Sequence, residues 1–197
     1  MIRVGKLTKR FGEKTLFSGL DLELPSPGFY ALLGPSGSGK TTLLRILSGL
    51  DREFEGTVET EGTVSCVFQE DRLIPTLSAF ENVFLVCGDR EKTERLLMQT
   101  GLSGGESGKE NDWNKYPGEL SGGMNRRVAL ARALAFPHDV LLLDEPFSAL
   151  DPATKSKVVD LVARTEKGKL LLLVTHDESE AESLGCECVR LATPHEE

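Results

Sequence analysis

The fold of this chain is decided by the stretch Gly34-Pro35-Ser36-Gly37-Ser38-Gly39-Lys40-Thr41. This stretch matches the pattern G-x-x-x-x-G-K-[ST], in which glycines allow successive backbone N–H groups to turn toward one point. An apolar run at residues 29–33 precedes it, and apolar side chains at helical spacing follow it, at Leu43, Ile46, Leu47 and Leu50. The sequence therefore predicts a phosphate-binding loop between a buried strand and an amphipathic helix.

The residue types in this loop indicate a nucleoside triphosphate. The helix that follows adds the positive end of its dipole to the ring of N–H groups. Lys40 can supply positive charge to the β- and γ-phosphates, and the Thr41 hydroxyl can ligate Mg²⁺. We expect the triphosphate to contact Gly34, Pro35, Ser36, Gly37, Ser38, Gly39, Lys40, Thr41 and Thr42.

Three apolar runs predict an α/β domain with a mixed sheet. They cover residues 29–33, 140–143 and 170–174, and unbroken hydrophobicity is typical of parallel strands that are covered on both faces. Helical patterns lie between these runs, one of them at residues 153–167. Residues 20–24 alternate between leucine and acidic side chains, which predicts antiparallel β structure near the N-terminus, and residues 57–60 and 64–68 are further strand candidates.

The change from strand-like to helical segments along the chain predicts one domain with an inserted helical lobe. We expect residues 1–72 and 135–197 to form the core of this single domain and residues 73–134 to form the lobe. Within the lobe, residues 103–118 are rich in Gly, Ser, Asn and charge, which indicates a mobile surface connection. The chain ends soon after Val189, so we expect no C-terminal regulatory domain.

Composition limits the possible locations and partners. The net charge is −8, which gives no electrostatic reason to bind nucleic acid. No apolar run approaches the roughly 20 residues that span a bilayer, and no signal-peptide pattern is present, so we expect a cytoplasmic protein. The four cysteines do not form zinc-ligand spacings with the histidines, which favours reduced thiols.

A pair of acidic residues follows the second apolar run. Asp144 and Glu145 stand where that strand is expected to end, and ligands bind at the carboxyl ends of strands in open α/β sheets. Asp144 is suited to hold the hydration shell of Mg²⁺, and Glu145 to polarise the attacking water.

A second Gly-rich stretch, Leu120-Ser121-Gly122-Gly123-Met124, precedes a helical segment. Ser121 can cap that helix, and the two glycines leave backbone N–H groups open to an oxyanion. One triphosphate already has a complete cradle at residues 34–41. The second stretch makes sense if it closes over a nucleotide that another subunit holds.

With these motifs in this order, the sequence resembles the ABC ATPase family over nearly its whole length. Residues 34–41 match the Walker A motif, Gln69 the Q-loop, and residues 120–124 the signature. Residues 140–145 match Walker B, residues 148–151 the D-loop, and His176 the switch histidine.

The resemblance implies roles for three further residues. Gln69 would sense Mg²⁺ and the attacking water while linking the core to the helical lobe, and His176 would contact the γ-phosphate. Phe11 stands where the family often has an aromatic ring stacked on adenine, although a core phenylalanine is an alternative. We interpret Arg126, Arg127 and Arg132 as a solvated helix face.

A similar stretch, Leu102-Ser103-Gly104-Gly105-Glu106, is not interpreted as the signature. The residues that follow it, 107–117, include Gly108, Asn111 and Pro117 and make a poor helix. Without a helix, the stretch has neither a dipole nor a row of N–H groups.

Met124 stands where the family signature more often has Gln. With Met at this position, the stretch at residues 120–124 resembles the branch that powers nitrate, sulfonate and taurine importers. The resemblance implies an ATPase on the inner face of the cell membrane. Its partners would be a separate transmembrane permease, a second copy of the chain in a head-to-tail dimer, and a solute-binding protein.

An ABC exporter or a lipoprotein-release motor is the alternative within transport, and a soluble ABC ATPase is the alternative outside it. Chromosome-maintenance members place a very long coiled coil in the interval that here spans only residues 42–119. A small-molecule kinase would lack the motifs at residues 120–124 and 148–151.

Overall fold

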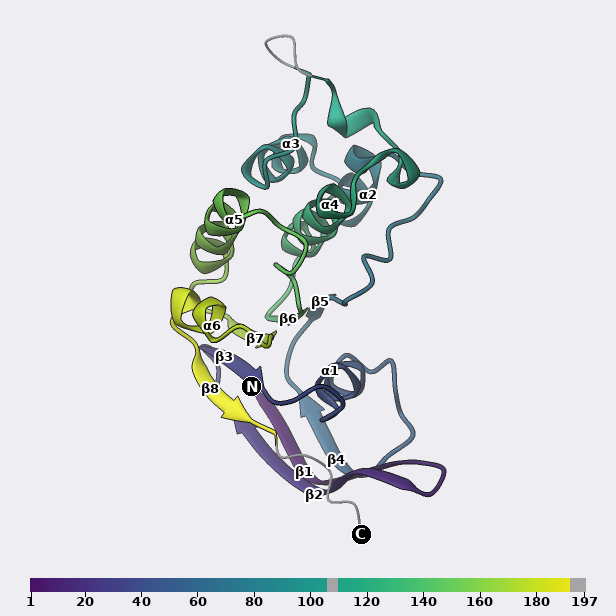
Figure 1. Cartoon of the computed structure of the whole chain (residues 1–197), viewed down its shortest axis with the longest axis vertical. Coiled ribbons are helices and arrows are strands. Elements are labelled where there is room, and N and C mark those ends of the chain that lie inside the picture. The colour runs from purple at the N-terminus through teal and green to yellow at the C-terminus, as the bar shows by residue number, and fades with distance from the viewer. Residues whose placement is uncertain (106–109, 192–197) are drawn as a thin grey trace. The chain divides into compact units, whose positions relative to one another are not determined.

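The computed structural model describes residues 1–105 and 110–191 (Figure 1). The chain divides into two compact units. The sheet unit contains Met1–Cys66, His138–Glu145 and the described residues from Glu166 onward. The helical unit contains Pro146–Thr165 and the described residues between Val67 and Pro137.

The sheet unit contains a five-stranded sheet with the strand order β5-β6-β7-β3-β8. Its middle strands are parallel: β3 pairs with β7 and with β8, and β6 pairs with β7. Every residue of β6 and β7 is buried, which confirms the prediction from their unbroken hydrophobicity. The strands are β3 (Gly28–Leu33), β5 (Val64–Val67), β6 (Val140–Asp144), β7 (Leu170–Val174) and β8 (Glu187–Arg190).

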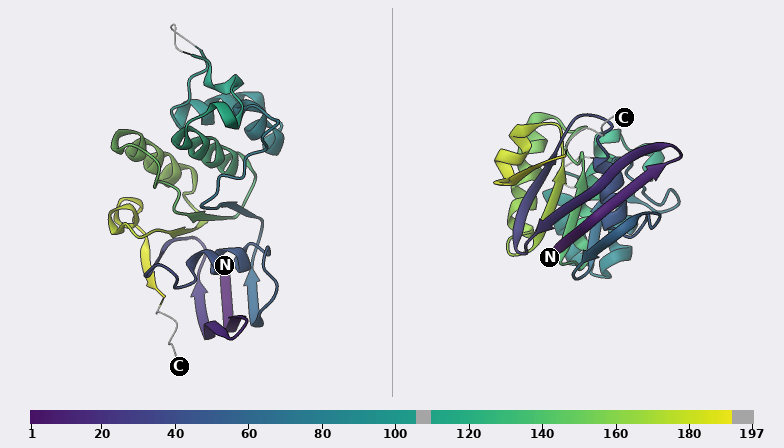
Figure 2. Two further views of the ribbon diagram at one scale, coloured as in Figure 1. Left: turned by 45° about the vertical axis from the view of Figure 1, so that its right-hand side comes forward. Right: turned by 90° about the horizontal axis from the view of Figure 1, so that it is seen from below.

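A second, antiparallel sheet completes the strands of this unit. Figure 2 shows β1 (Ile2–Phe11) between β2 (Lys14–Leu24) and β4 (Glu55–Thr60). In β2 the leucines are more buried than the acidic residues between them, so the alternating pattern predicted this strand correctly. The α/β core and the antiparallel region expected from the sequence are therefore both present, as a sheet with parallel strands and a separate antiparallel sheet.

Two helices belong to the sheet unit, α1 (Lys40–Leu47) and α6 (Glu178–Leu184). The prediction that Leu50 continues the apolar face of the first helix was wrong. The helix ends at Leu47, and Leu50 lies beyond it with 55% of its surface exposed. Gly49 takes φ +74°, and its N–H and that of Leu50 bond to the last helical carbonyls, which stops the helix early.

The helical unit is built around α4, which packs against α2 and α3, while α3 also packs against α5. The Ser78 hydroxyl and the Glu81 carboxylate form a capping box at the start of α2. The predicted lobe, residues 73–134, lies in this unit, which also contains α5. Its helices are α2 (Ala79–Cys87), α3 (Arg90–Gln99), η2 (Asp112–Asn114), η3 (Pro117–Glu119), α4 (Gly122–Ala135) and α5 (Pro152–Thr165). No helix in residues 1–105 or 110–191 is long and apolar enough to cross a membrane.

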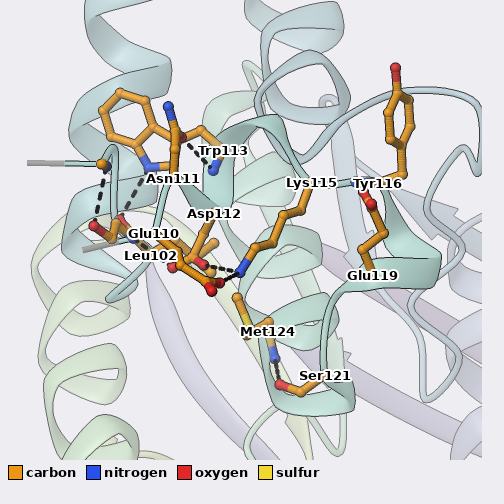
Figure 3. A network of polar contacts seen from close by, with 12 residues as sticks. Leu102, Glu110, Asn111, Asp112, Trp113, Lys115, Tyr116, Glu119, Ser121 and Met124 are labelled. Carbon is orange, nitrogen blue, oxygen red and sulfur yellow. Dashed lines mark hydrogen bonds and ion pairs between the residues drawn. The ribbon is translucent and has the colours of Figure 1, made fainter. Parts of the chain in front are cut away.

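The connection between α3 and α4 shows how the two Ser-Gly-Gly stretches differ (Figure 3). Gly104 forms a bridge with Asn111, and the Trp113 indole N–H donates to the carbonyl of Leu102 at 3.1 Å. A Cβ on Gly104 would lie 2.9 Å from the Trp113 ring, so the glycine is needed for this packing. Of the predicted mobile connection, residues 106–109 lie outside the described residues. Among residues 110–120, the helical segments before Ser121 are the short 3₁₀ helices η2 and η3, in agreement with the poor helix expected there.

Candidate functional site

The predicted phosphate loop lies between β3 and α1, as the sequence indicated. Gly37 and Gly39 have φ angles of +81° and +92°, a region that side chains with a Cβ rarely adopt. A Cβ on Gly39 would also lie 2.6 Å from the Phe17 ring, which belongs to β2. Both the turn and its support by β2 therefore require glycine at position 39.

The polar groups of the loop converge at the first turn of α1. Gly39 is the N-cap of α1, and no side chain caps this helix. The Lys40 ammonium donates to the carbonyls of Gly34, at 2.7 Å, and Pro35, at 2.9 Å, which holds the charge across the loop. The Ser38 hydroxyl is 1% exposed and has no hydrogen-bond partner among the described residues. Leaving a buried hydroxyl unsatisfied costs about 1–3 kcal/mol, so the loop fits a ligand with phosphate oxygens.

Two of the predicted metal ligands belong to the sheet unit, one at the start of α1 and one at the end of β6. Thr41 is the second residue of α1, and Asp144 is the last residue of β6, where it is buried. Helix α1 packs against β6, and the carboxyl ends of parallel strands meet at the same edge. A hydroxyl and a carboxylate are the hard oxygen donors that Mg²⁺ prefers, so this donor set fits the ion.

Glu145 and His176 form an ion pair at the same edge. The Glu145 carboxylate lies 2.9 Å from Nδ1 of His176, whose pKa is raised by this hydrogen bond and by the carboxylate charge. Glu145 has a φ of +49°, an uncommon value for a residue with a side chain, and its N–H donates to the carbonyl of Val174. Backbone strain of this kind clusters at functional sites. The structure thus brings together two residues that the sequence assigned to the reaction.

Gln69 lies in the helical unit, two residues after β5 ends. Its backbone carbonyl accepts a hydrogen bond from the guanidinium of Arg126. The interpretation of the three arginines as a solvated helix face was therefore wrong. Arg126 is only 5% exposed. Arg127 donates to the backbone carbonyl of Gly101. Arg132 donates to the backbone carbonyls of Asp71 and Arg72.

The physical reason is that loop carbonyls still need hydrogen-bond donors once they leave a strand. An arginine side chain offers five N–H donors in a planar fork, so one guanidinium can satisfy two carbonyls. A signal was present in the sequence: residues 128–135 are almost all small or apolar, and a helix so largely buried leaves little solvated face.

The signature stretch begins α4. The Ser121 hydroxyl accepts a hydrogen bond from the Met124 N–H at 3.2 Å, which confirms the predicted cap (Figure 3). The space around Gly122 is open, since nothing lies within 4 Å of an added Cβ. Gly123 has another purpose: a Cβ there would lie 2.8 Å from the carbonyl of Ala149. The close approach of residues 148–151 to this helix start was not foreseen from the sequence.

Phe11 ends β1 and is not a core residue, because 56% of its surface is exposed. The Lys9 ammonium lies 4.9 Å from the centre of its ring and is held by Asp51, at 2.9 Å, and by the carbonyl of Glu53. An open pocket of about 500 Å³ adjoins the ring; its lining residues are Lys9, Phe11, Arg45, Gly49, Leu50, Asp51, Arg52 and Glu53. The exposed ring is compatible with stacking, and its contact with adenine stays a prediction.

The sequence of this chain is similar to those of known proteins. Residues 17–148 match the family described as ABC transporter. The chain is 46% identical to the aliphatic sulfonates import ATP-binding protein SsuB 3 of Nocardia farcinica, over 91% of this chain and 72% of that protein. It is 46% identical to SsuB 1 of Rhodococcus jostii, over 87% of this chain and 71% of that protein.

Solved structures of the ATP-binding cassette MJ0796 have the same fold. Its dimeric structure superposes with a TM-score of 0.86 at 31% identity, covering 97% of this chain and 94% of that one. A dimeric post-hydrolysis state with ADP and Pi gives a TM-score of 0.85 at the same identity and coverage. Sequence and structure agree that this chain belongs to the ABC transporter family.

Proposed function

We propose that this chain is the ATP-binding and ATP-hydrolysing subunit of an importer. The observation that carries the proposal is the presence of two helix N-termini suited to phosphate, one in each unit. The loop before α1 surrounds an anion with the groups of one chain, whereas α4 offers an open start at Gly122. Two copies arranged head to tail would place the α4 start of one over the nucleotide of the other, and MJ0796 forms a dimer.

The residues of the sheet unit divide the work of hydrolysis. The loop amides and Lys40 bind the phosphates, while Thr41 and Asp144 would hold Mg²⁺, which neutralises charge on the β- and γ-phosphates. Glu145 orients a water in line with the γ-phosphate and accepts its proton as the bond to the β-phosphate oxygen breaks, leaving ADP and phosphate. His176, which pairs with the Glu145 carboxylate, would contact the γ-phosphate. Gln69 belongs to the helical unit, and its proposed role of sensing Mg²⁺ and the attacking water rests on its motif.

The names of the relatives support a transport role and suggest its substrate class. Both SsuB proteins are named for the import of aliphatic sulfonates. We infer a transmembrane permease as partner, a solute-binding protein that delivers a small sulfonate-like anion, and a position at the cytoplasmic face of the membrane. Closure of two ATP-bound copies would drive the permease, and hydrolysis would reopen them.

The substitution Glu145→Gln tests this proposal. It keeps the size of the side chain but removes the charge that polarises water, so hydrolysis should slow by about 10²- to 10⁴-fold while ATP binding survives. Because hydrolysis reopens the dimer, the variant should accumulate as an ATP-bound dimer on size-exclusion chromatography with light scattering in Mg²⁺-ATP. The matched control is Glu182→Gln, which changes an exposed carboxylate of the same unit and should behave as the parent. A Glu145→Gln variant that stays monomeric at saturating ATP would contradict the head-to-tail arrangement.

A further inference from the structure

We propose that Arg126 is a positioning residue: from α4 it holds the backbone at Gln69, so that the helix that begins with the signature sets the position of the Gln69 side chain. The inference rests on the proposed function, in which Gln69 assists hydrolysis. It adds a residue whose role the family motifs quoted above do not include.

The contacts of Arg126 are directed at consecutive carbonyls. Its Nη1 donates to the carbonyl of Phe68 at 2.6 Å, and its Nη2 donates to the carbonyl of Gln69. Its Nε lies 3.2 Å from the carboxylate of Asp71. The guanidinium thus contacts residues on both sides of Gln69 as well as Gln69 itself.

Arg132 extends the same arrangement along the segment. Its Nη1 donates to the carbonyl of Arg72 at 3.0 Å, and its Nη2 donates to the carbonyl of Asp71 at 3.1 Å. Two arginines of one helix therefore hold four carbonyls of the segment that follows β5, which ends at Val67. Fixing the carbonyl at position 69 restricts the backbone from which the Gln69 side chain projects.

Burial makes the contact specific to arginine. Arg126 is almost entirely removed from water, and Asp71 has a raised pKa because burial outweighs the opposing charges of Arg126 and Arg132. A buried guanidinium is tolerated when it is paired, and here its planar fork reaches two carbonyls at once while Nε faces the Asp71 carboxylate. A lysine at this position would keep the charge but place only a single ammonium between the two carbonyls.

The position of Arg126 on α4 links the start of this helix to the backbone of Gln69. Ser121 caps this helix, and Arg126 follows five residues later, which is about 7–8 Å along a helix with a rise of 1.5 Å per residue. A shift of α4 on meeting a partner's nucleotide would therefore reach the Gln69 backbone through Arg126. The arrangement couples the α4 start to a residue that serves the chain's own nucleotide.

The test is a double-mutant cycle in the full chain with Arg126→Gln and Gln69→Ala. Arg126→Gln should leave the Kd for ATP unchanged, lower kcat by about 10- to 100-fold and raise the Mg²⁺ concentration for half-maximal activity. Since both substitutions remove the same positioned group, the double variant should be no slower than the slower single variant. Arg126→Lys, which keeps the buried charge, should recover part of the activity and serves as the second variant if Arg126→Gln melts below the assay temperature.

The matched control is Lys92→Met, which removes another contact between a cation and a carbonyl. Lys92 donates to Ala135 at 2.7 Å, and Ala135 is the last residue of α4, nine residues after Arg126. Lys92→Met should change kcat little, and its effect should multiply with that of Gln69→Ala. If the losses from Arg126 substitution and Gln69→Ala multiply in the same independent way, the positioning role is wrong while the proposed function stands. If Gln69→Ala alone leaves hydrolysis unchanged, the role of Gln69 in the proposed function fails, and the inference fails with it.

Discussion

The two helices that begin at Gly-rich stretches differ in how their first N–H groups, which have no acceptor within the helix, are capped. Helix α1 has Gly39 as its N-cap in a left-handed conformation, with no side-chain cap and a lysine as its first residue. Helix α4 has Ser121 as its N-cap in an extended conformation, and the Ser121 hydroxyl already accepts one of its N–H groups. The first start is shaped to surround a ligand, whereas the second has one donor satisfied and can complete a site formed elsewhere. From this difference we infer that similar Gly-rich sequences can build a full site, before α1, and a half site, at the start of α4.

The largest effect should come from the full site. Lys40→Ala removes the charge that the loop holds near its carbonyls, and charged contacts to phosphate are worth about 1.5–3 kcal/mol or more. The Kd for ATP should therefore rise by roughly 100-fold, as measured by isothermal titration calorimetry, and hydrolysis should be lost. Lys167→Ala, which changes an exposed lysine of the same unit, is the control and should bind ATP as the parent does. Equal affinities in the two variants would mean that the loop before α1 does not bind phosphate.

The half site should respond differently, with hydrolysis lost but ATP binding kept. Ser121→Arg places a bulky cation at the α4 start, so hydrolysis should fall to the background while ATP binding by the isolated subunit stays within about twofold. The other Ser-Gly-Gly stretch provides the control, because Ser103→Arg alters a stretch that starts no α-helix and should retain most of the hydrolysis. Calorimetry and a phosphate-release assay separate the two activities. Loss of ATP binding together with hydrolysis in Ser121→Arg would show that both helix starts act within one chain.

Much of this comparison could be predicted from the sequence, because the deciding signals are local. Continuous apolar residues in β6 and β7 reported burial on both faces, and the poor helix formers after Ser103 separated the two Ser-Gly-Gly stretches. No local sequence pattern predicted the path of the chain after β5. The sequence alone suggested that the arginines on α4 are solvated, because it does not show that carbonyls of residues 68–72 lie beside them.

Phe11 shows a second limit of the sequence. An aromatic residue at the end of a strand suits both a core and an exposed platform, and no local pattern distinguishes the two. In the structure the β1–β2 turn follows directly, so the ring stays largely exposed beside Lys9. Leu50 was misjudged for a related reason, since helical periodicity continued past the residue at which Gly49 ends α1.

A smaller effect is expected at Phe11, whose exposed ring we propose stacks on the adenine of a nucleotide bound at the full site. Phe11→Ala should weaken ATP binding by about 1–3 kcal/mol, the range for an aromatic ring that stacks on a base, while kcat at saturating ATP changes little. Phe11→Trp should keep the affinity because it retains a stacking face. Leu50→Ala removes an exposed aliphatic side chain from the same pocket and should change the Kd much less. If Phe11→Ala and Leu50→Ala have equal, small effects, the ring does not stack on adenine.

The smallest expected effect is the change in stability with pH that comes from the titration of His176. This titration also distinguishes the two sites, because the helix start at Ser121-Gly122-Gly123 contains no titratable side chain. The pKa of His176 is raised, first by its hydrogen bond to Glu145, then by the charge of Glu145, with smaller contributions from Glu180 and Asp177. Protonated His176 therefore stabilises the folded chain. That contribution is fully present at pH values below the pKa of an unfolded histidine and is lost as the pH rises through the folded pKa. Since 75% of the His176 side chain is exposed, the change in stability should be small, and the pKa itself is the better observable.

Ring-proton chemical shifts of His176, assigned by comparison with His176→Asn, measure that pKa directly in the nucleotide-free protein. The value should lie above about 6.5, the ordinary histidine value, and should fall toward it in Glu145→Gln, because the neutral amide no longer favours the imidazolium. Glu182→Gln should leave the titration unchanged, since its carboxylate is not among the groups that act on His176. A His176 pKa that is the same in the parent and in Glu145→Gln would show that the two side chains do not pair in solution. The ion pair at the strand ends would then no longer mark the full site as different from the helix start of α4.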